Sequence, residues 1–451
     1  MLTALAFLCI NALGCVLSIL RGPFWGLLVY ANIYFNVPDP QMNWWASYLP
    51  NFRWSLTITA VIIISMILHQ DKLSKHKLRN VYWLFVFYAL TGIITYTVAV
   101  DIEDAINHSY LLFTFCVIVF VIIKSLSEKE KLRTFILVTI GLAGHLSLLA
   151  YTSGRRIHGR LENIGPADAH SSNEFGVLLA AIIPFLLPFF LRGKKWERII
   201  CLLVSPFILN AFILCNSRGA FVALVFGIIY SFILIANKKV RKYLIICSLC
   251  SIPVMLYLAD DEFVQRLSSL WISDRSSELA VDTLSSGRTE IWRYGMTMVK
   301  DYPFGAGPNG FKKLARFYMP REILTFHPGA KYGVRGAHNS YLQVWVEQGY
   351  LGIIIFLLLC FHTMFLLYKS SKILKELSMS GTFCDLLVLS MNISFACSMF
   401  GGMFGAQVYY EFFWWQIALA TVLYSFVLNI QNENHQDADQ QITGKKMLGV
   451  S

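Results

Sequence analysis

The sequence predicts an all-α membrane protein, a polytopic helical bundle of about 12 spans and possibly 13, with one large helical loop. Of the 451 residues, 56% are hydrophobic and only 14% are charged. A soluble domain is about a quarter charged. Apolar runs near the ~20 residues needed to cross ~30 Å of hydrocarbon recur along almost the whole chain. These observations favour one membrane bundle over several soluble domains.

Twelve apolar runs are predicted as spans, and a thirteenth is ambiguous. The twelve are residues 2–20, 54–70, 81–100, 109–124, 133–151, 174–191, 199–215, 220–236, 243–258, 350–368, 383–402 and 411–428. The ambiguous run at 23–36 is a thin span or a re-entrant piece, and it decides on which side the N-terminus lies. Because no basic residues precede the first run and no small-residue cleavage site follows it, we interpret it as a retained span.

Lysine and arginine gather in five short connections, all on one side if the spans alternate. These connections are residues 72–79, 124–133, 192–198, 238–242 and 369–375. The positive-inside rule assigns that side to the cytoplasm. It also accounts for the net charge of +11, so no nucleic-acid partner is expected. The large loop then faces away from the cytoplasm.

Four regions follow from this topology. They are an N-terminal transmembrane bundle at 1–258, the large loop at 259–340, C-terminal transmembrane helices at 341–430, and a cytoplasmic tail at 431–451. The tail is polar and is predicted to be disordered. The ten cysteines all lie inside or at the ends of apolar stretches, which favours packing over disulfides or redox chemistry.

The large loop is acidic in its first half and basic in its second. Between residues 288 and 335 there are nine basic side chains against three acidic ones. The positive-inside rule disfavours such residues on this side. A cationic cavity beside the membrane would suit an anionic substrate, particularly a diphosphate.

Three residues stand out as candidates for chemistry. Arg218 lies in a tight turn between apolar runs, where a charge is costly unless it is paired or functional. Arg288 follows Ser-Ser-Gly at a predicted helix start, a position that favours anions, although a surface arginine is the simpler reading. His338 lies where loop becomes helix and could act as a general base, or be an interfacial histidine that water satisfies. Asn339 or Ser340 could cap that helix.

Other patterns are weaker. Gly305-Ala306-Gly307 resembles a phosphate loop, but no strand precedes it, so a structural turn is the favoured interpretation. Arg155, Arg156 and Arg160 could contact lipid headgroups. His327, His338, Asp301 and Glu322 lack the spacing of metal ligands, and no Asp-x-Asp occurs on the outward face. We therefore expect no metal and no cofactor.

Several motifs resemble the O-antigen ligase and polymerase superfamily. They are Asn216-Ser217-Arg218-Gly219, Ser286-Gly287-Arg288, Pro303-Phe304-Gly305-Ala306-Gly307, His338-Asn339-Ser340-Tyr341-Leu342 and Gly349-Tyr350-Leu351-Gly352. Each motif alone is weak, but their order and their placement in the large loop are specific. The resemblance covers about residues 160–352.

The resemblance implies a GT-C-like glycosyltransferase of the bacterial inner membrane with a periplasmic site. Such an enzyme moves a glycan from undecaprenyl diphosphate to an acceptor hydroxyl, without a metal and with inversion. Carried over to this chain, Arg218 and Arg288 would hold the diphosphate, and His338 would deprotonate the acceptor. Lipid A-core is the favoured acceptor. A growing glycan, for a polymerase, or a protein, for an O-oligosaccharyltransferase, stays open.

Six further residues are predicted to bind substrate. They are Arg160, Arg293, Lys331, Arg335, Asn339 and Tyr341. The alternative from another class is a transporter or flippase of polyprenyl-linked glycans. A transporter would carry charges within its spans and in symmetric halves. Here the spans are nearly uncharged, and the basic residues gather at one end of the predicted bundle, next to the membrane surface. This distribution favours the enzyme.

Overall fold

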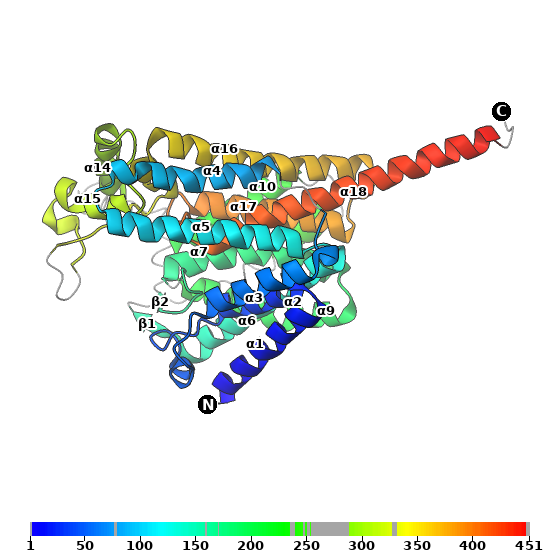
Figure 1. Ribbon diagram of the computed structural model, residues 1–451, viewed down its shortest axis with the longest axis horizontal. Helices are drawn as coiled ribbons and strands as arrows, with labels where there is room; N and C mark the ends of the chain where they lie inside the picture. Colours follow the sequence, from blue (N-terminus) through cyan, green and yellow to red (C-terminus); the bar gives the residue numbers. More distant parts are fainter. Residues whose placement is uncertain are drawn as a thin grey trace.

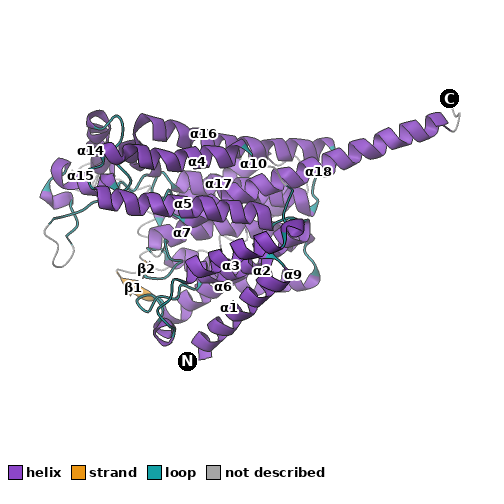
Figure 2. Cartoon of the chain, viewed as in Figure 1, coloured by secondary structure: helices purple, strands orange, loops and turns teal. Residues whose placement is uncertain are grey.

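A computed structural model describes residues 2–75, 79–157, 160–169, 171–234, 240–246, 249, 253, 288–326 and 332–447. As predicted, it is a bundle of α-helices (Figures 1 and 2). The fold is all-α, as predicted, and carries a small hairpin, in which β1 (Arg155–Ile157) pairs antiparallel with β2 (Arg160–Glu162), Ile157 lying opposite Arg160.

Within the described residues, nine helical segments are long and apolar enough to cross a membrane. They are α1 (Leu2–Arg21), α4 (Asn80–Ile94) with its 3-10 extension to Val98, α5 (Ile102–Ser125), α6 (Lys129–Ser153), α7 (Ser172–Ile182) continuing into α8 (Leu186–Arg192), α9 (Lys195–Leu214), α16 (Ser340–Glu376), α17 (Phe383–Gly401) and α18 (Glu411–Met447).

The remaining predicted spans are not among these nine segments. Two form shorter apolar helices, α3 (Trp54–Leu68) and α10 (Arg218–Leu234). The predicted span at 243–258 lies largely outside the described residues. The count of 12 or 13 spans therefore stays a prediction.

The ambiguous run at 23–36 forms α2 (Pro23–Phe35), a helix of 13 residues. At 1.5 Å per residue it is about 20 Å long, less than the hydrocarbon thickness. It follows a turn at Gly22, whose φ is +118°, and packs against α1, α3 and α6. Because most of its side chains are buried, α2 is a short helix inside the protein.

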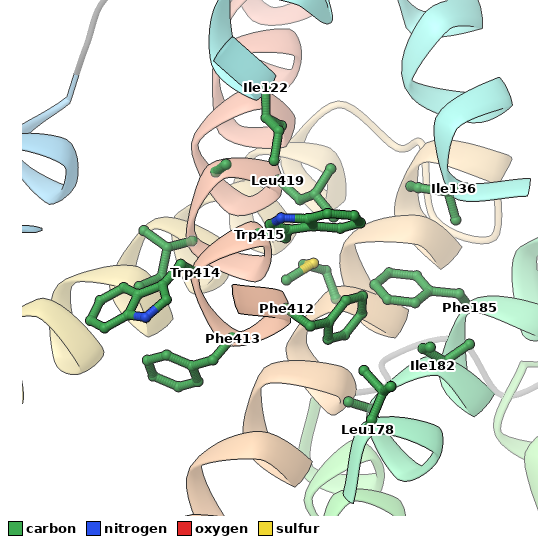
Figure 3. Packing of buried hydrophobic residues seen from close by; sticks show 14 of the residues in the cluster. Ile122, Ile136, Leu178, Ile182, Phe185, Phe412, Phe413, Trp414, Trp415 and Leu419 are labelled. Carbon is green, nitrogen blue, oxygen red and sulfur yellow. The ribbon is translucent and has the colours of Figure 1, made fainter. Parts of the chain in front are cut away.

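The core of the bundle is built around α18. The Trp414 ring stacks on Phe85 of α4, with ring centroids 3.9 Å apart. Trp415 packs between Tyr34 of α2 and Phe135 of α6. Figure 3 shows Trp415 on the side of α18 that faces apolar side chains of α5, α6 and α7, and Trp414 on another side of the helix. Their N–H groups are satisfied inside the core, Trp414 by the Val408 carbonyl and Trp415 by the Glu411 carboxylate, as burial requires.

The end of α18 differs from the sequence prediction. The helix continues to Met447 and projects from the bundle (Figure 1), whereas a disordered tail was predicted from residue 431. Residues 431–443 contain neither proline nor glycine. Nothing local therefore stops the helix before Gly444.

Hydrogen bonds and an ion pair link three of the basic connections at one end of the bundle, and join one of them to the segment before α17. The Ser74 amide donates to the Lys124 carbonyl at 2.8 Å, which joins the first connection to the second. Arg133 pairs with the buried Glu197 of α9. Arg192 donates to the carbonyl of Gly381, before α17. These three of the five basic connections therefore lie together in the described structure.

The opposite end carries the helices of the large loop. These are α14 (Arg288–Asp301), α15 (Gly310–Tyr318) and the short 3-10 helix η5 (Arg321–Ile323), left of the bundle in Figure 1. They share a small apolar core with the start of α16, which includes Ile291, Phe311 and Leu342. An isolated bridge between Thr325 and Val334 closes the segment before His338.

A break in α16 fastens this layer to the bundle. Gly349 has φ 66° and ψ −164°, so the helix is interrupted there. The amides of Ala306 and Gly307 donate to the carbonyls of Val346 and Glu347, at 2.8 and 2.9 Å. In return, the Tyr350 amide donates to Pro303 at 3.1 Å. The Gly-Ala-Gly run is therefore a structural turn that satisfies carbonyls freed at the break.

Glycine is required on both sides of this junction. A Cβ at Gly349 would lie 2.5 Å from the Phe304 carbonyl carbon, and one at Gly305 would lie 2.6 Å from the Glu347 oxygen. Both residues also have positive φ, which side chains disfavour. The sequence motifs Pro303–Gly307 and Gly349–Gly352 thus meet in one contact.

This contact predicts a stability effect. Gly349→Ala should lower the free energy of unfolding by about 1–3 kcal/mol or more, because alanine at that φ and ψ is strained and collides with the turn. Thermal unfolding of the purified protein in detergent would measure it. Gly141→Ala is the control, since that position on α6 has nothing within 4 Å. Equal melting temperatures for the two variants would contradict the proposed constraint.

Candidate functional site

The fold brings together basic residues that lie far apart in the sequence. The charges of Arg218, Arg160 and Arg335 all act on the guanidinium of Arg288. Those of Arg288, Arg335 and Lys312 act on His338. The contributing elements are β2, α10, α14, α15 and the loop before α16. We call Arg160, Arg218, Arg288, Arg335 and His338 the arginine cluster.

Asn173 ties two parts of the arginine cluster together. Its Oδ1 accepts a hydrogen bond from Nη2 of Arg160 at 2.7 Å and another from Oγ of Ser217 at 2.9 Å. Arg160 also donates from Nε to the Cys215 carbonyl at 3.4 Å. The turn that precedes Arg218 and the strand that carries Arg160 are therefore held by one amide oxygen.

Local geometry positions Arg218 at the start of α10. Asn216 has φ +46°, so the chain turns sharply after α9. The Ala220 amide donates to Oγ of Ser217 at 3.3 Å, an N-terminal capping interaction. Gly176 of α7 lies against this turn, since a Cβ there would lie 3.0 Å from Ala220. The close approach of α7 places Asn173 within reach.

Arg288 begins α14 and is partly buried. Burial first, and then the charges of Arg218, Arg160 and Arg335, lower the pKa of its guanidinium. The group nevertheless stays protonated, as arginine does in proteins. In the described part of the chain, no carboxylate lies within ion-pair distance of Arg288 or Arg335. Like charges held close together favour an anion as their partner.

His338 is held at the edge of the arginine cluster by its neighbours. Its backbone is left-handed, with φ +47°. Trp292 of α14 donates from Nε1 to the carbonyl of the preceding Ala337 at 3.1 Å. A strained backbone that tertiary contacts hold in place is frequent at functional sites.

The ionisation of His338 suits a base. Burial, together with the charges of Arg288, Arg335 and Lys312, lowers the pKa of His338 to about 4. Its imidazole is therefore neutral at pH 7 and can accept a proton. An ordinary histidine, with a pKa of about 6.5, would begin to protonate near neutral pH.

Asn339 and Tyr341 use their polar atoms within the fold. Asn339 Oδ1 accepts from the amides of Tyr341 and Leu342, at 3.0 and 3.1 Å, and caps α16. The Tyr341 hydroxyl donates to the Met399 carbonyl at 2.8 Å. Ser340 donates to the Gly405 carbonyl. A role of Asn339 or Tyr341 in substrate binding stays a prediction.

Of the other predicted binding residues, some lie in the arginine cluster and others do not. Arg335 lies in the arginine cluster and donates to Thr325 at 3.3 Å, while its Nε is buried without a hydrogen-bond partner. Arg293 is 73% exposed and lies 3.9 Å from Glu290. It follows Arg288 by five positions, about 140° round the helix axis. Lys331 falls outside the described residues.

Two residues near the site were not found from the sequence. Lys312 acts on His338, but one lysine in a basic helix carries no signal of its own. Asn173 had a partial signal, because it lies inside the Ser171–Glu174 capping box, which predicts a helix start. Within the described ranges, no three His, Cys, Asp or Glu side chains are grouped so that they could hold a metal ion.

Part of the chain is similar to a known protein family. Residues 200–357 match the family model described as O-antigen ligase. The match spans Arg218, Arg288, Arg335 and His338. No curated protein sequence matches the chain. The resemblance noted in the motifs is therefore confirmed, since residues 200–357 of this chain are similar to the O-antigen ligase family.

Proposed function

We propose that this protein is a glycosyltransferase of the O-antigen ligase type. It moves a glycan from undecaprenyl diphosphate to an acceptor hydroxyl, with lipid A-core as the first acceptor. It acts at the periplasmic face of the bacterial inner membrane, without a metal. The observation that carries the proposal is that Arg218 and Arg335 lie close enough to act on Arg288, while Arg288 and Arg335 act in turn on His338, a neutral base.

The arginines would hold the donor. A diphosphate needs several positive charges or hydrogen-bond donors to stabilise it as a leaving group. Arg218 and Arg288 would supply forked donors that match its oxygens. Arg160, oriented by Asn173 and the Cys215 carbonyl, would add positive potential. The charges that usually come from a divalent ion would thus come from the protein.

His338 would activate the acceptor. Its free ring nitrogen would accept the proton of the acceptor hydroxyl as the oxygen attacks the anomeric carbon. The bond between that carbon and the diphosphate oxygen would break, and its electron pair would leave with undecaprenyl diphosphate. One direct displacement inverts the anomeric configuration. The proton on His338 would then pass to water.

The transporter alternative has less support. The basic residues that converge lie at one end of the bundle, on loops and helix starts, rather than at mid-membrane positions in symmetric halves. A polymerase would use the same donor site and is the second candidate, because the match to the superfamily does not distinguish the acceptor.

Loss of the base should abolish transfer. His338→Ala, expressed in a strain that lacks the chromosomal gene, should reduce transfer by about 10²–10⁴-fold. A gel of cell-surface glycans would then show unattached, lipid-linked polymer for a ligase and single repeat units on the acceptor for a polymerase. His362→Ala, on α16 far from the arginine cluster, is the control. Normal surface glycan in the His338 variant would remove the base assignment.

The fork of Arg288 should matter as well as its charge. Arg288→Lys keeps the charge but loses the bidentate geometry. We expect at least a tenfold loss of kcat/KM for the lipid-linked donor, measured with purified enzyme. Arg321→Lys, on the exposed η5, is the matched control and should retain activity. Full activity of Arg288→Lys would argue against a diphosphate clamp.

The low pKa of His338 predicts the pH dependence. In the free enzyme the base is neutral above its pKa of about 4, so kcat/KM should stay level from pH 8 down to about pH 5. Bound diphosphate would offset the arginine charges and raise this pKa, so kcat should fall at a higher pH than kcat/KM. Initial rates at low and saturating donor would test this. An acid limb of kcat/KM near pH 6.5 would contradict it.

A further inference from the structure

A charged cavity lies among the basic connections, at the end of the bundle opposite the arginine cluster. Its volume is about 830 Å³. Described residues between α3 and α4, the end of the α5–α6 connection with the first turn of α6, and one face of α18 form its walls. The lining residues are Asp71, Lys72, Leu73, Lys75, Arg79, Ser127, Glu128, Lys131, Ser425, Leu428, Asn429 and Asn432. It shares no residue with the arginine cluster.

The cavity carries positive charge that the protein does not balance. Four of its lining side chains are basic and two are acidic. Glu128 is engaged by Lys131, with Nζ 2.6 Å from its Oε1. Among the described residues, Lys72, Lys75 and Arg79 form no ion pair. The excess positive charge therefore faces the cavity.

Arg79 supplies a separate indication of a missing partner. Its guanidinium lies over the ring of Tyr424, 4.9 Å from the centroid, and this contact holds it against α18. Its Nε is buried and has no hydrogen-bond acceptor. A buried donor without an acceptor is costly. An anion in the cavity could satisfy it.

The surroundings favour a lipid as the source of that anion. The two helices that adjoin the cavity, α3 and α4, expose apolar side chains next to it. Ile67 and Leu68 are 64% and 59% exposed, and Trp83 and Phe87 are 50% and 56% exposed. Tryptophan is enriched where a span meets the headgroup layer. Acyl chains could lie on these surfaces while the headgroup enters the cavity.

We propose that this cavity binds the phosphate of an anionic membrane lipid from the leaflet on the side of the basic connections. Lys75 and Arg79 hold the phosphate, and the amides of Asn429 and Asn432 face the rest of the headgroup. Basic pockets between spans on the cytoplasmic side are suited to such headgroups. The bound lipid would join the first two basic connections to α18.

The test measures lipid binding by the full-length protein, purified in detergent. Native mass spectrometry would compare phosphatidylglycerol with phosphatidylethanolamine of the same acyl chains. We expect retained adducts with phosphatidylglycerol and few with the zwitterionic lipid. In a second set of measurements, inorganic phosphate at millimolar concentration is added as a competitor, because soluble phosphate offers the same charged group as the lipid. Displacement of the lipid by inorganic phosphate would overturn the lipid as the source.

Variants locate the site. Lys75→Gln and the double variant Lys75→Gln with Arg79→Gln should weaken phosphatidylglycerol binding about fivefold for each charge removed. Lys75 is exposed, so its single variant does not endanger folding. Lys195→Gln, a basic residue of the same end outside the cavity, should bind normally. Wild-type affinity in the double variant, or an equal loss in Lys195→Gln, would refute the proposal.

Discussion

The break in α16 at Gly349 is the constraint on which the arrangement of the site depends. A helix in a membrane must satisfy its backbone polar groups within the protein. The break frees the carbonyls of Val346 and Glu347, and the turn at Ala306 and Gly307 supplies amides for them. This exchange ties α14 and α15 to the bundle. His338 directly precedes α16, so the start of this helix places it near Arg288, and any side chain at Gly349 would disturb the contact.

Burial and the positive charges around it determine the protonation state of His338. Arg160 is oriented by an amide oxygen and a backbone carbonyl, and Arg335 by a hydroxyl. These neutral acceptors fix the geometry of the two side chains. Burial and the charges of Arg288, Arg335 and Lys312 keep His338 neutral. In the proposed function, one arrangement would serve two roles, since the charges that would bind the diphosphate also suppress protonation of His338.

Much of the fold was predictable, because hydrocarbon demands long apolar helices and basic loops stay on one side. The predictions were less accurate where the hydropathy of a segment does not indicate its secondary structure or its position in the bundle. Run 23–36 is apolar because it is buried in protein, and length alone shows that it is too short to span. The helix of α18 beyond residue 431 follows from backbone propensity rather than hydropathy. The β1–β2 hairpin depends on pairing between segments too short to leave a periodic pattern.

The sequence by itself determined the membrane class, the positions of most helices and the motifs that contain Arg218, Arg288 and His338. These are local properties, set by the composition of each segment and by the order of residues within short motifs. Only the tertiary structure decided which arginines converge. It placed Arg335 and Arg160 beside Arg288, turned Arg293 toward solvent, and revealed Asn173 as the link between two elements. The neighbours that a helical side chain faces, and the contacts between distant segments, arise from packing. No single stretch of sequence encodes this packing.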